Sequence, residues 1–110
     1  MNDTSLNVCR LNVNHLYNKI PDVTHFIHSQ TDTIHIMGIT ESMLDDRMND
    51  ANIAIQNYTV LRRDKAFELH RGIAVYIHDT IYKNIKRRDD FEIREIESIW
   101  LQVEQKNQTL

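Results

Sequence analysis

The sequence predicts an α/β domain in which a mixed β-sheet is flanked by a helix. Two short apolar stretches, 6–13 and 33–40, are separated by a segment with helical spacing, and this order is that of a βαβ unit. Two further apolar stretches, 58–62 and 73–78, are joined by charged residues, as in a long antiparallel hairpin. The chain holds only two Gly and one Pro, so these boundaries follow from the spacing of apolar residues.

Each element expected in the first half has its own pattern. Residues 6–13 form an apolar pattern with a slip near Arg10, which fits a strand that contains a bulge. The helix is expected from near Asn18, with Pro21 tolerated in its first turn, because apolar residues then recur every three or four positions. Residues 33–40 are apolar on both faces, so we expect an interior strand with parallel neighbours.

The second half is expected to consist mainly of strands. Residues 43–54 should form a loop or a short helical turn before the hairpin. The last stretch, 91–105, is rich in isoleucine and is interpreted as one or two β segments. Tyr76 and Trp100 lie within apolar strand patterns, so both are expected in the core.

Composition limits the classes of protein that this chain can be. With 110 residues it is one domain or a piece of one, and its 41% hydrophobic and 26% charged residues are ordinary globular usage. The net charge of -3 does not by itself indicate a nucleic-acid partner. Cys9 is the only cysteine, which excludes an intrachain disulfide, and it is expected to be a small buried hydrophobe. No signal peptide or membrane helix is recognisable, so we expect an intracellular protein of the nucleus or cytoplasm.

Polar residues follow both strands of the predicted βαβ unit. Asn12 or Asn14 ends the first strand and Glu41 ends the second. The carboxyl ends of parallel strands meet at one edge of a sheet, where ligands commonly bind. A carboxylate and an amide suit Mg²⁺, which takes few protein ligands and could assist phosphodiester hydrolysis. The alternative is that the Asn caps a helix and that Glu41 is a solvated loop residue.

Five motifs occur in an order that is typical of one enzyme family. They are "LNVNHLYNKI", "IHIMGITESML", "IQNYTVLRRD", "RGIAVYIHD" and "EIESIWLQV". This set resembles the endonuclease/exonuclease/phosphatase family, most of all the endonuclease domain that precedes the reverse transcriptase in non-LTR (LINE-like) retrotransposon polyproteins. The resemblance covers residues 6 to 104 and implies that 1–110 is the N-terminal half of a four-layer α/β sandwich. It also implies a Mg²⁺-dependent endonuclease that nicks DNA.

The resemblance assigns roles to individual residues. It makes Asn12 the amide that organises the scissile phosphate, and Glu41 the catalytic ligand of Mg²⁺. Asn14 stands where relatives often have Arg, and Glu97 matches an acidic position on a later strand. Relatives have a run of glycines where this chain has only Gly72. The chain also has no "GDFN"-like or "SDH"-like stretch, so general acid/base groups are expected to be absent and activity feeble.

Several other interpretations stay open. The chain could be a non-catalytic remnant or interaction module that self-associates through an uncovered sheet face. It could instead resemble family members that act on phosphomonoesters or lipids. The basic stretches 62–65 and 86–88 are either DNA contacts or solvated loops. His25 and His28 share a helix face but have no evident third zinc ligand, so they are expected at the surface.

Overall fold

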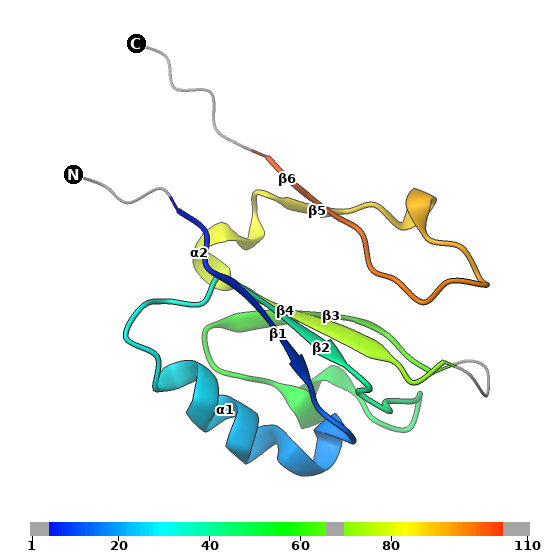
Figure 1. Cartoon of the computed structure of the whole chain (residues 1–110), viewed down its shortest axis with the longest axis horizontal. Helices are drawn as coiled ribbons and strands as arrows, with labels where there is room; N and C mark the ends of the chain where they lie inside the picture. Colours follow the sequence, from blue (N-terminus) through cyan, green and yellow to red (C-terminus); the bar gives the residue numbers. More distant parts are fainter. Residues whose placement is uncertain (1–4, 66–69, 105–110) are drawn as a thin grey trace.

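A mixed four-stranded sheet with one helix on one face and a two-stranded hairpin on the other makes up this small α/β domain (Figure 1). The computed structural model describes residues 5–65 and 70–104. From one edge of the sheet to the other, the strands are β1 (Val8–Asn12), β2 (Ile36–Thr40), β4 (Ile73–His78) and β3 (Tyr58–Arg63). The helix is α1 (Ile20–His28), and the hairpin consists of β5 (Ile85–Arg87) and β6 (Leu101–Val103).

Strand pairing confirms the βαβ unit and corrects two details of the prediction. β1 and β2 are parallel in an unbroken register from Val8 opposite Ile36 to Asn12 opposite Thr40, so there is no bulge at Arg10. β2 is interior, but its second neighbour β4 is antiparallel. The apolar stretch indicated an interior strand, and it carries no information about the direction of the neighbours.

The hairpin of β3 and β4 is antiparallel as expected, and part of its connection, 66–69, lies outside the described residues. Short elements that the sequence did not reveal follow it. They are the one-turn helix α2 (Asp79–Tyr82), the strand β5 and the 3-10 turn η3 (Asp89–Phe91). The stretch 91–105 was predicted as one or two β segments. Among its described residues, the only strand is β6, and 92–100 is a loop.

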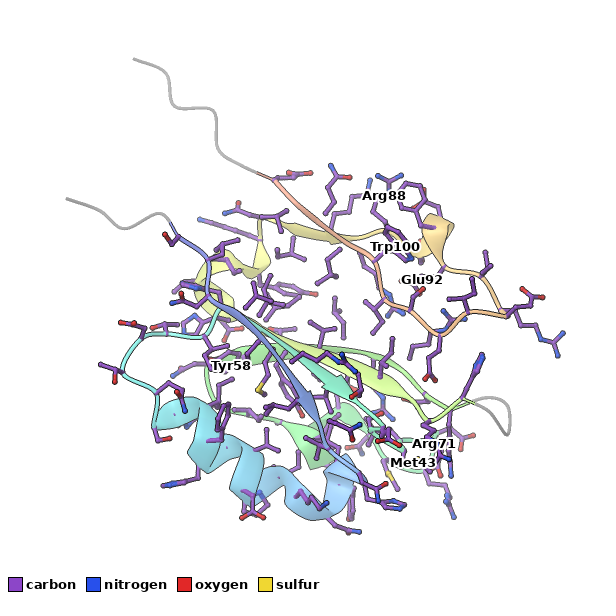
Figure 2. All side chains as sticks on the ribbon, in the orientation of Figure 1. Met43, Tyr58, Arg71, Arg88, Glu92 and Trp100 are labelled. Atoms are coloured by element: carbon purple, nitrogen blue, oxygen red, sulfur yellow. The ribbon has the colours of Figure 1, made fainter. Side chains whose placement is uncertain are left out.

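Trp100 is not a core residue, contrary to the prediction. Trp100 is 51% exposed and lies in the segment before β6 (Figure 2). Its ring is 5.5 Å from that of Phe91 in an edge-to-face arrangement. Polar contacts hold this loop, since Arg63 donates hydrogen bonds to the carbonyls of Ile93, Ile96 and Ser98. An apolar pattern therefore did not require burial, because side chain to backbone bonds fix the loop against the sheet.

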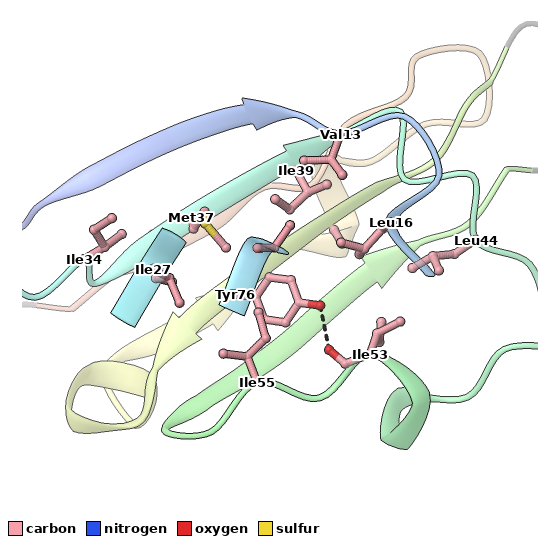
Figure 3. Close-up of a cluster of buried hydrophobic side chains, with 12 residues drawn as sticks. Val13, Leu16, Ile27, Ile34, Met37, Ile39, Leu44, Ile53, Ile55 and Tyr76 are labelled. Carbon is pink, nitrogen blue, oxygen red and sulfur yellow. Dashed lines mark hydrogen bonds between the residues drawn. The ribbon is translucent and has the colours of Figure 1, made fainter. Parts of the chain in front are cut away.

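The core lies between α1 and the sheet (Figure 3). A 3-10 turn, η1 (Leu16–Lys19), leads directly into α1, and Pro21 falls in the first turn as predicted. Leu16, Val23 and Ile27 are buried on the helical side, and they face the buried side chains of the central strands β2 and β4. These strand residues are Met37, Ile39, Ala74 and Tyr76. Regular spacing of apolar residues was therefore sufficient to predict this interface.

Tyr76 is fully buried, which confirms its expected place in the core. Its hydroxyl donates a 2.6 Å hydrogen bond to the carbonyl oxygen of Ile53, at the end of the 3-10 turn η2 (Asp50–Ile53) in the predicted loop. Cys9 packs half-buried against the same core, and burial raises the pKa of its thiol. A raised pKa disfavours the thiolate, so Cys9 acts here as a hydrophobe. In the described part of the chain, no helix has the length and apolar character needed to cross a bilayer.

Candidate functional site

The ends of β1 and β2 and the start of β4 lie together at one end of the sheet. For the site, edge denotes this boundary, where the strands stop, and not an outer strand. Asn12, the last residue of β1, pairs with Thr40, and Glu41 follows Thr40 directly. Backbone bonds extend this pairing into the loops, since Val13 N donates to Thr40 O at 2.9 Å and His15 N donates to Glu41 O at 3.2 Å. Parallel pairing therefore brings the two predicted site residues, Asn12 and Glu41, to the same edge.

Unusual backbone conformations are concentrated at this edge. Within 5–65 and 70–104, five residues have positive φ, and four of them lie here: His15 (65°), Glu41 (55°), Met43 (57°) and Gly72 (86°). The fifth, Asn57, precedes β3 at the opposite edge. A side chain such as that of Glu disfavours this conformation by about 1–2 kcal/mol. Strain of this kind is most often found at functional sites, where the surrounding structure holds it in place.

The Glu41 carboxylate faces the guanidinium of Arg71. The Glu41 Oε1 atom lies 3.7 Å from Arg71 Nε, and the two side chains are 33% and 60% exposed. Arg71 comes from the segment just before β4, and it lies with Met43 at the end of the sheet away from α2 (Figure 2). The sequence analysis did not single out Arg71, because it is distant from Glu41 along the chain and no local pattern links them.

Glu97 reaches the same edge from the loop between η3 and β6. Its Oε2 accepts a hydrogen bond from Gly72 N at 2.8 Å, and its Oε1 accepts one from Arg71 N at 3.3 Å. The prediction that Glu97 lies on a later strand is wrong, since it is in a loop. Glu97 nevertheless belongs to the candidate site, where it binds two consecutive backbone N–H groups.

Ser42 and Gly72 join the loop after β2 to the start of β4. Ser42 N donates to Gly72 O at 3.0 Å, and Met43 N donates to Arg71 O at 2.7 Å. The Ser42 side chain is buried, and its hydroxyl has no hydrogen-bond partner. A Cβ atom on Gly72 would lie 2.6 Å from Ser42 Oγ, so only glycine fits without a shift. Close packing and the positive φ angle therefore both require glycine at position 72.

The donor atoms at this edge fit a hard cation better than zinc. In the part of the chain that the structure describes, no group of three or more His, Cys, Asp and Glu side chains is arranged around a common point. His25 and His28 are exposed as predicted, and His28 Nε2 lies 3.1 Å from the carbonyl oxygen of Gln56. Glu41 with the amide of Asn12 or Asn14, both of which are exposed, would leave most positions to water and phosphate, as Mg²⁺ favours.

The two basic stretches hold the fold together. Arg62 forms a forked pair with Asp64 at 2.8 Å, and Arg87 forms one with Glu92 at 2.8 and 2.9 Å. Arg63 binds the carbonyls of the loop before β6, as described above. These interactions account for Arg62, Arg63 and Arg87 without a bound ligand.

Comparisons of this chain with protein-family models, curated proteins and solved structures found no match. A function for this protein therefore has to be proposed from its own residues and their arrangement.

Proposed function

We propose that this chain is the N-terminal half of a Mg²⁺-dependent phosphodiesterase of the endonuclease/exonuclease/phosphatase type, related to the DNA-nicking domains of LINE-like retrotransposons. The observation that carries the proposal is that Asn12 and Glu41 lie at the same edge of the sheet, where positive φ angles are concentrated. The ordered motifs in the sequence support the same family. In this proposal the mixed sheet and α1 are two layers of a four-layer sandwich.

The chain's own residues would have distinct tasks at this edge. Glu41 would supply the carboxylate oxygen for Mg²⁺, and its positive φ fixes the direction in which its side chain leaves the loop. Asn12 would use its amide to orient a phosphate of the DNA backbone. Mg²⁺, when bound, polarises a phosphate oxygen and stabilises the leaving oxygen of a hydrolysed phosphodiester. The "GDFN"-like and "SDH"-like motifs are missing from these 110 residues, so we expect metal binding with slow nicking.

Metal binding by the 110-residue chain tests this proposal directly. Mn²⁺, a paramagnetic substitute for Mg²⁺, should broaden the amide NMR signals of residues 12–15 and 40–43, and excess Mg²⁺ should reverse the broadening. Glu41→Gln should abolish the effect, since it removes the charge and keeps the shape. Unchanged broadening in Glu41→Gln, or none in the wild type, would overturn the site.

Supercoiled-plasmid nicking in Mg²⁺ then tests the reaction, with EDTA as the blank. Asn12→Ala should lower the rate of any Mg²⁺-dependent nicking by at least about tenfold, as expected for a group that orients the reacting phosphate. Asn14→Ala is the comparison that separates the two candidate amides, because Asn14 is also exposed and lies two positions further along the chain. Equal effects of the two variants would contradict the role of Asn12.

A second candidate function is self-association of a non-catalytic module. The sheet face opposite α1 carries a shallow apolar groove of about 260 Å³, and one of the residues that line it, Val8 of β1, is 65% exposed. The other apolar side chains of the groove include Ile36, Val75 and Leu101. A second copy of this chain would cover this face and pair with the free edge strand β1.

Light scattering across a range of protein concentrations tests this second candidate. Val8→Lys should abolish a concentration-dependent dimer, because it places a charge in the groove. Val103→Lys is the matched control, since Val103 is 41% exposed and does not line the groove. A monomer at all concentrations would exclude self-association of this chain through the face.

A further inference from the structure

Arg71 is the most loosely paired arginine among the ion pairs of the described residues. Its Nε lies 3.7 Å from Glu41 Oε1, beyond hydrogen-bond distance, whereas the other pairs are separated by 2.6–3.1 Å. Its side chain is 60% exposed at the edge that carries Glu41. Arg88, by contrast, forms a forked pair with Asp90 at 2.7 and 2.9 Å and binds Gln102 as well. Arg71 therefore has donor capacity that its contact with Glu41 does not use.

The backbone of Arg71 is fixed although its side chain is loosely held. Its N–H is bound by Glu97 Oε1, and its carbonyl oxygen accepts the 2.7 Å bond from Met43 N. The next N–H, that of Gly72, is bound by Glu97 Oε2. The bond from Met43 ties the start of β4 to the loop that carries Glu41, and the two bonds to Glu97 tie it to the loop before β6. A guanidinium on this backbone is accordingly presented beside Glu41 at little cost in backbone entropy.

From this geometry we infer that Arg71 is a second phosphate-contacting residue of the site, in addition to Asn12, and that Glu97 positions it. The inference rests on the proposed function, because it assumes that Glu41 binds a divalent cation. A cation on Glu41 would repel the guanidinium and neutralise its partner, which leaves Arg71 free to bind an anion nearby. The planar fork of Arg donates two parallel hydrogen bonds to phosphate oxygens, so a DNA backbone phosphate matches it. Without the cation, Arg71 partly neutralises Glu41.

Two measurements on the full chain test this assignment. The first is the Mn²⁺ affinity of the Arg71→Gln variant, from amide broadening. Removal of the competing guanidinium should strengthen Mn²⁺ binding by about 2- to 5-fold, the size expected for an exposed ion pair. The second is the affinity for a fluorescein-labelled thymidine 12-mer in Mg²⁺ at several salt concentrations. Loss of one phosphate contact should lower the slope of log affinity against log salt by about 0.7.

Three variants control for charge and for stability. Arg71→Lys keeps the charge, so its Mn²⁺ affinity should stay within about 2-fold of wild type. Lys83→Gln removes an exposed positive charge near α2, at the opposite edge of the sheet, and should leave both measurements unchanged. Glu97→Gln should lower the salt slope in the wild type and have no further effect in Arg71→Gln. A structural role for Glu97 alone would not produce that dependence on Arg71.

The outcomes separate this inference from the proposed function. If Mn²⁺ binding fails in the wild type or persists in Glu41→Gln, the proposed function and this inference both fall. If Mn²⁺ binds at Glu41 while Arg71→Gln changes neither its affinity nor the salt slope, only the role of Arg71 is refuted. A change in just one of the two measurements also refutes it, because competition for Glu41 and phosphate contact are both required.

Discussion

Replacement of Gly72 by Ala tests whether close packing shapes the candidate site. Gly72 has a φ of 86°, which costs an L-residue about 1–2 kcal/mol. The added Cβ would lie 2.6 Å from Ser42 Oγ, and 3.3 and 3.4 Å from the backbone nitrogens of Met43 and Lys65. Overpacking of this kind typically costs about 1–3 kcal/mol. Gly72→Ala should therefore lower the free energy of unfolding by about 2–5 kcal/mol.

Two further variants separate the steric cost from the backbone cost. Ser42→Ala removes the buried, unpartnered hydroxyl, so by itself it should be neutral or slightly stabilising. Combined with Gly72→Ala, it should remove the clash with Oγ. The loss of stability should then fall to the about 1–2 kcal/mol that comes from φ. Gly38→Ala is the matched control, because its Cβ would meet only Cys9 O at 3.9 Å. That control should change stability by less than about 1 kcal/mol.

Urea unfolding followed by far-UV circular dichroism would measure these differences. The expected order of stability is wild type and Ser42→Ala highest, the double variant in between, and Gly72→Ala lowest. A loss below about 0.5 kcal/mol for Gly72→Ala, a difference too small for either effect, would refute the packing at this edge. If the stability changes of the two single variants simply add in the double variant, the Oγ contact is not what excludes a side chain at position 72.

Two further predictions concern single carboxylates. Glu41 has a φ of 55°, so Glu41→Gly should be more stable than Glu41→Ala by about 1 kcal/mol, although neither variant should bind Mn²⁺. Equal stability, or a less stable glycine variant, would contradict the left-handed conformation. Glu92 is 8% exposed, and its hydrogen bonds from Arg87 lower the pKa of its carboxyl. A lowered pKa in the folded state means that, as pH falls, the unfolded chain takes up the proton first. The stabilisation is therefore complete above the ordinary pKa of 4.5, and it is lost as pH falls through the lower pKa of the folded state. Urea unfolding between about pH 6 and pH 3 should therefore show a steeper loss of stability in the wild type than in Glu92→Gln, and parallel curves would contradict the shift.

Local patterns in the sequence were sufficient for much of the fold. The spacing of Leu16, Val23 and Ile27 predicted the buried face of η1 and α1, and the predicted helix start near Asn18 lies close to the observed start at Ile20. The apolar stretches predicted β1 to β4, because alternation and helical spacing are properties of neighbouring residues. The same reasoning failed for Trp100, whose loop is fixed by hydrogen bonds from Arg63, a residue far away in the chain.

The sequence by itself predicted that Asn12 or Asn14 stands at the end of the first strand and that Glu41 follows the second. Only the tertiary structure decided that Arg71 and Glu97 join Glu41, since strand pairing and the loop before β6 bring together residues that are distant in the chain. It also decided that β4 runs antiparallel to β2 and that Gly72 must lack a side chain. The physical reason is that sequence patterns report local conformation and burial, whereas contacts and strain at a site depend on which surfaces meet.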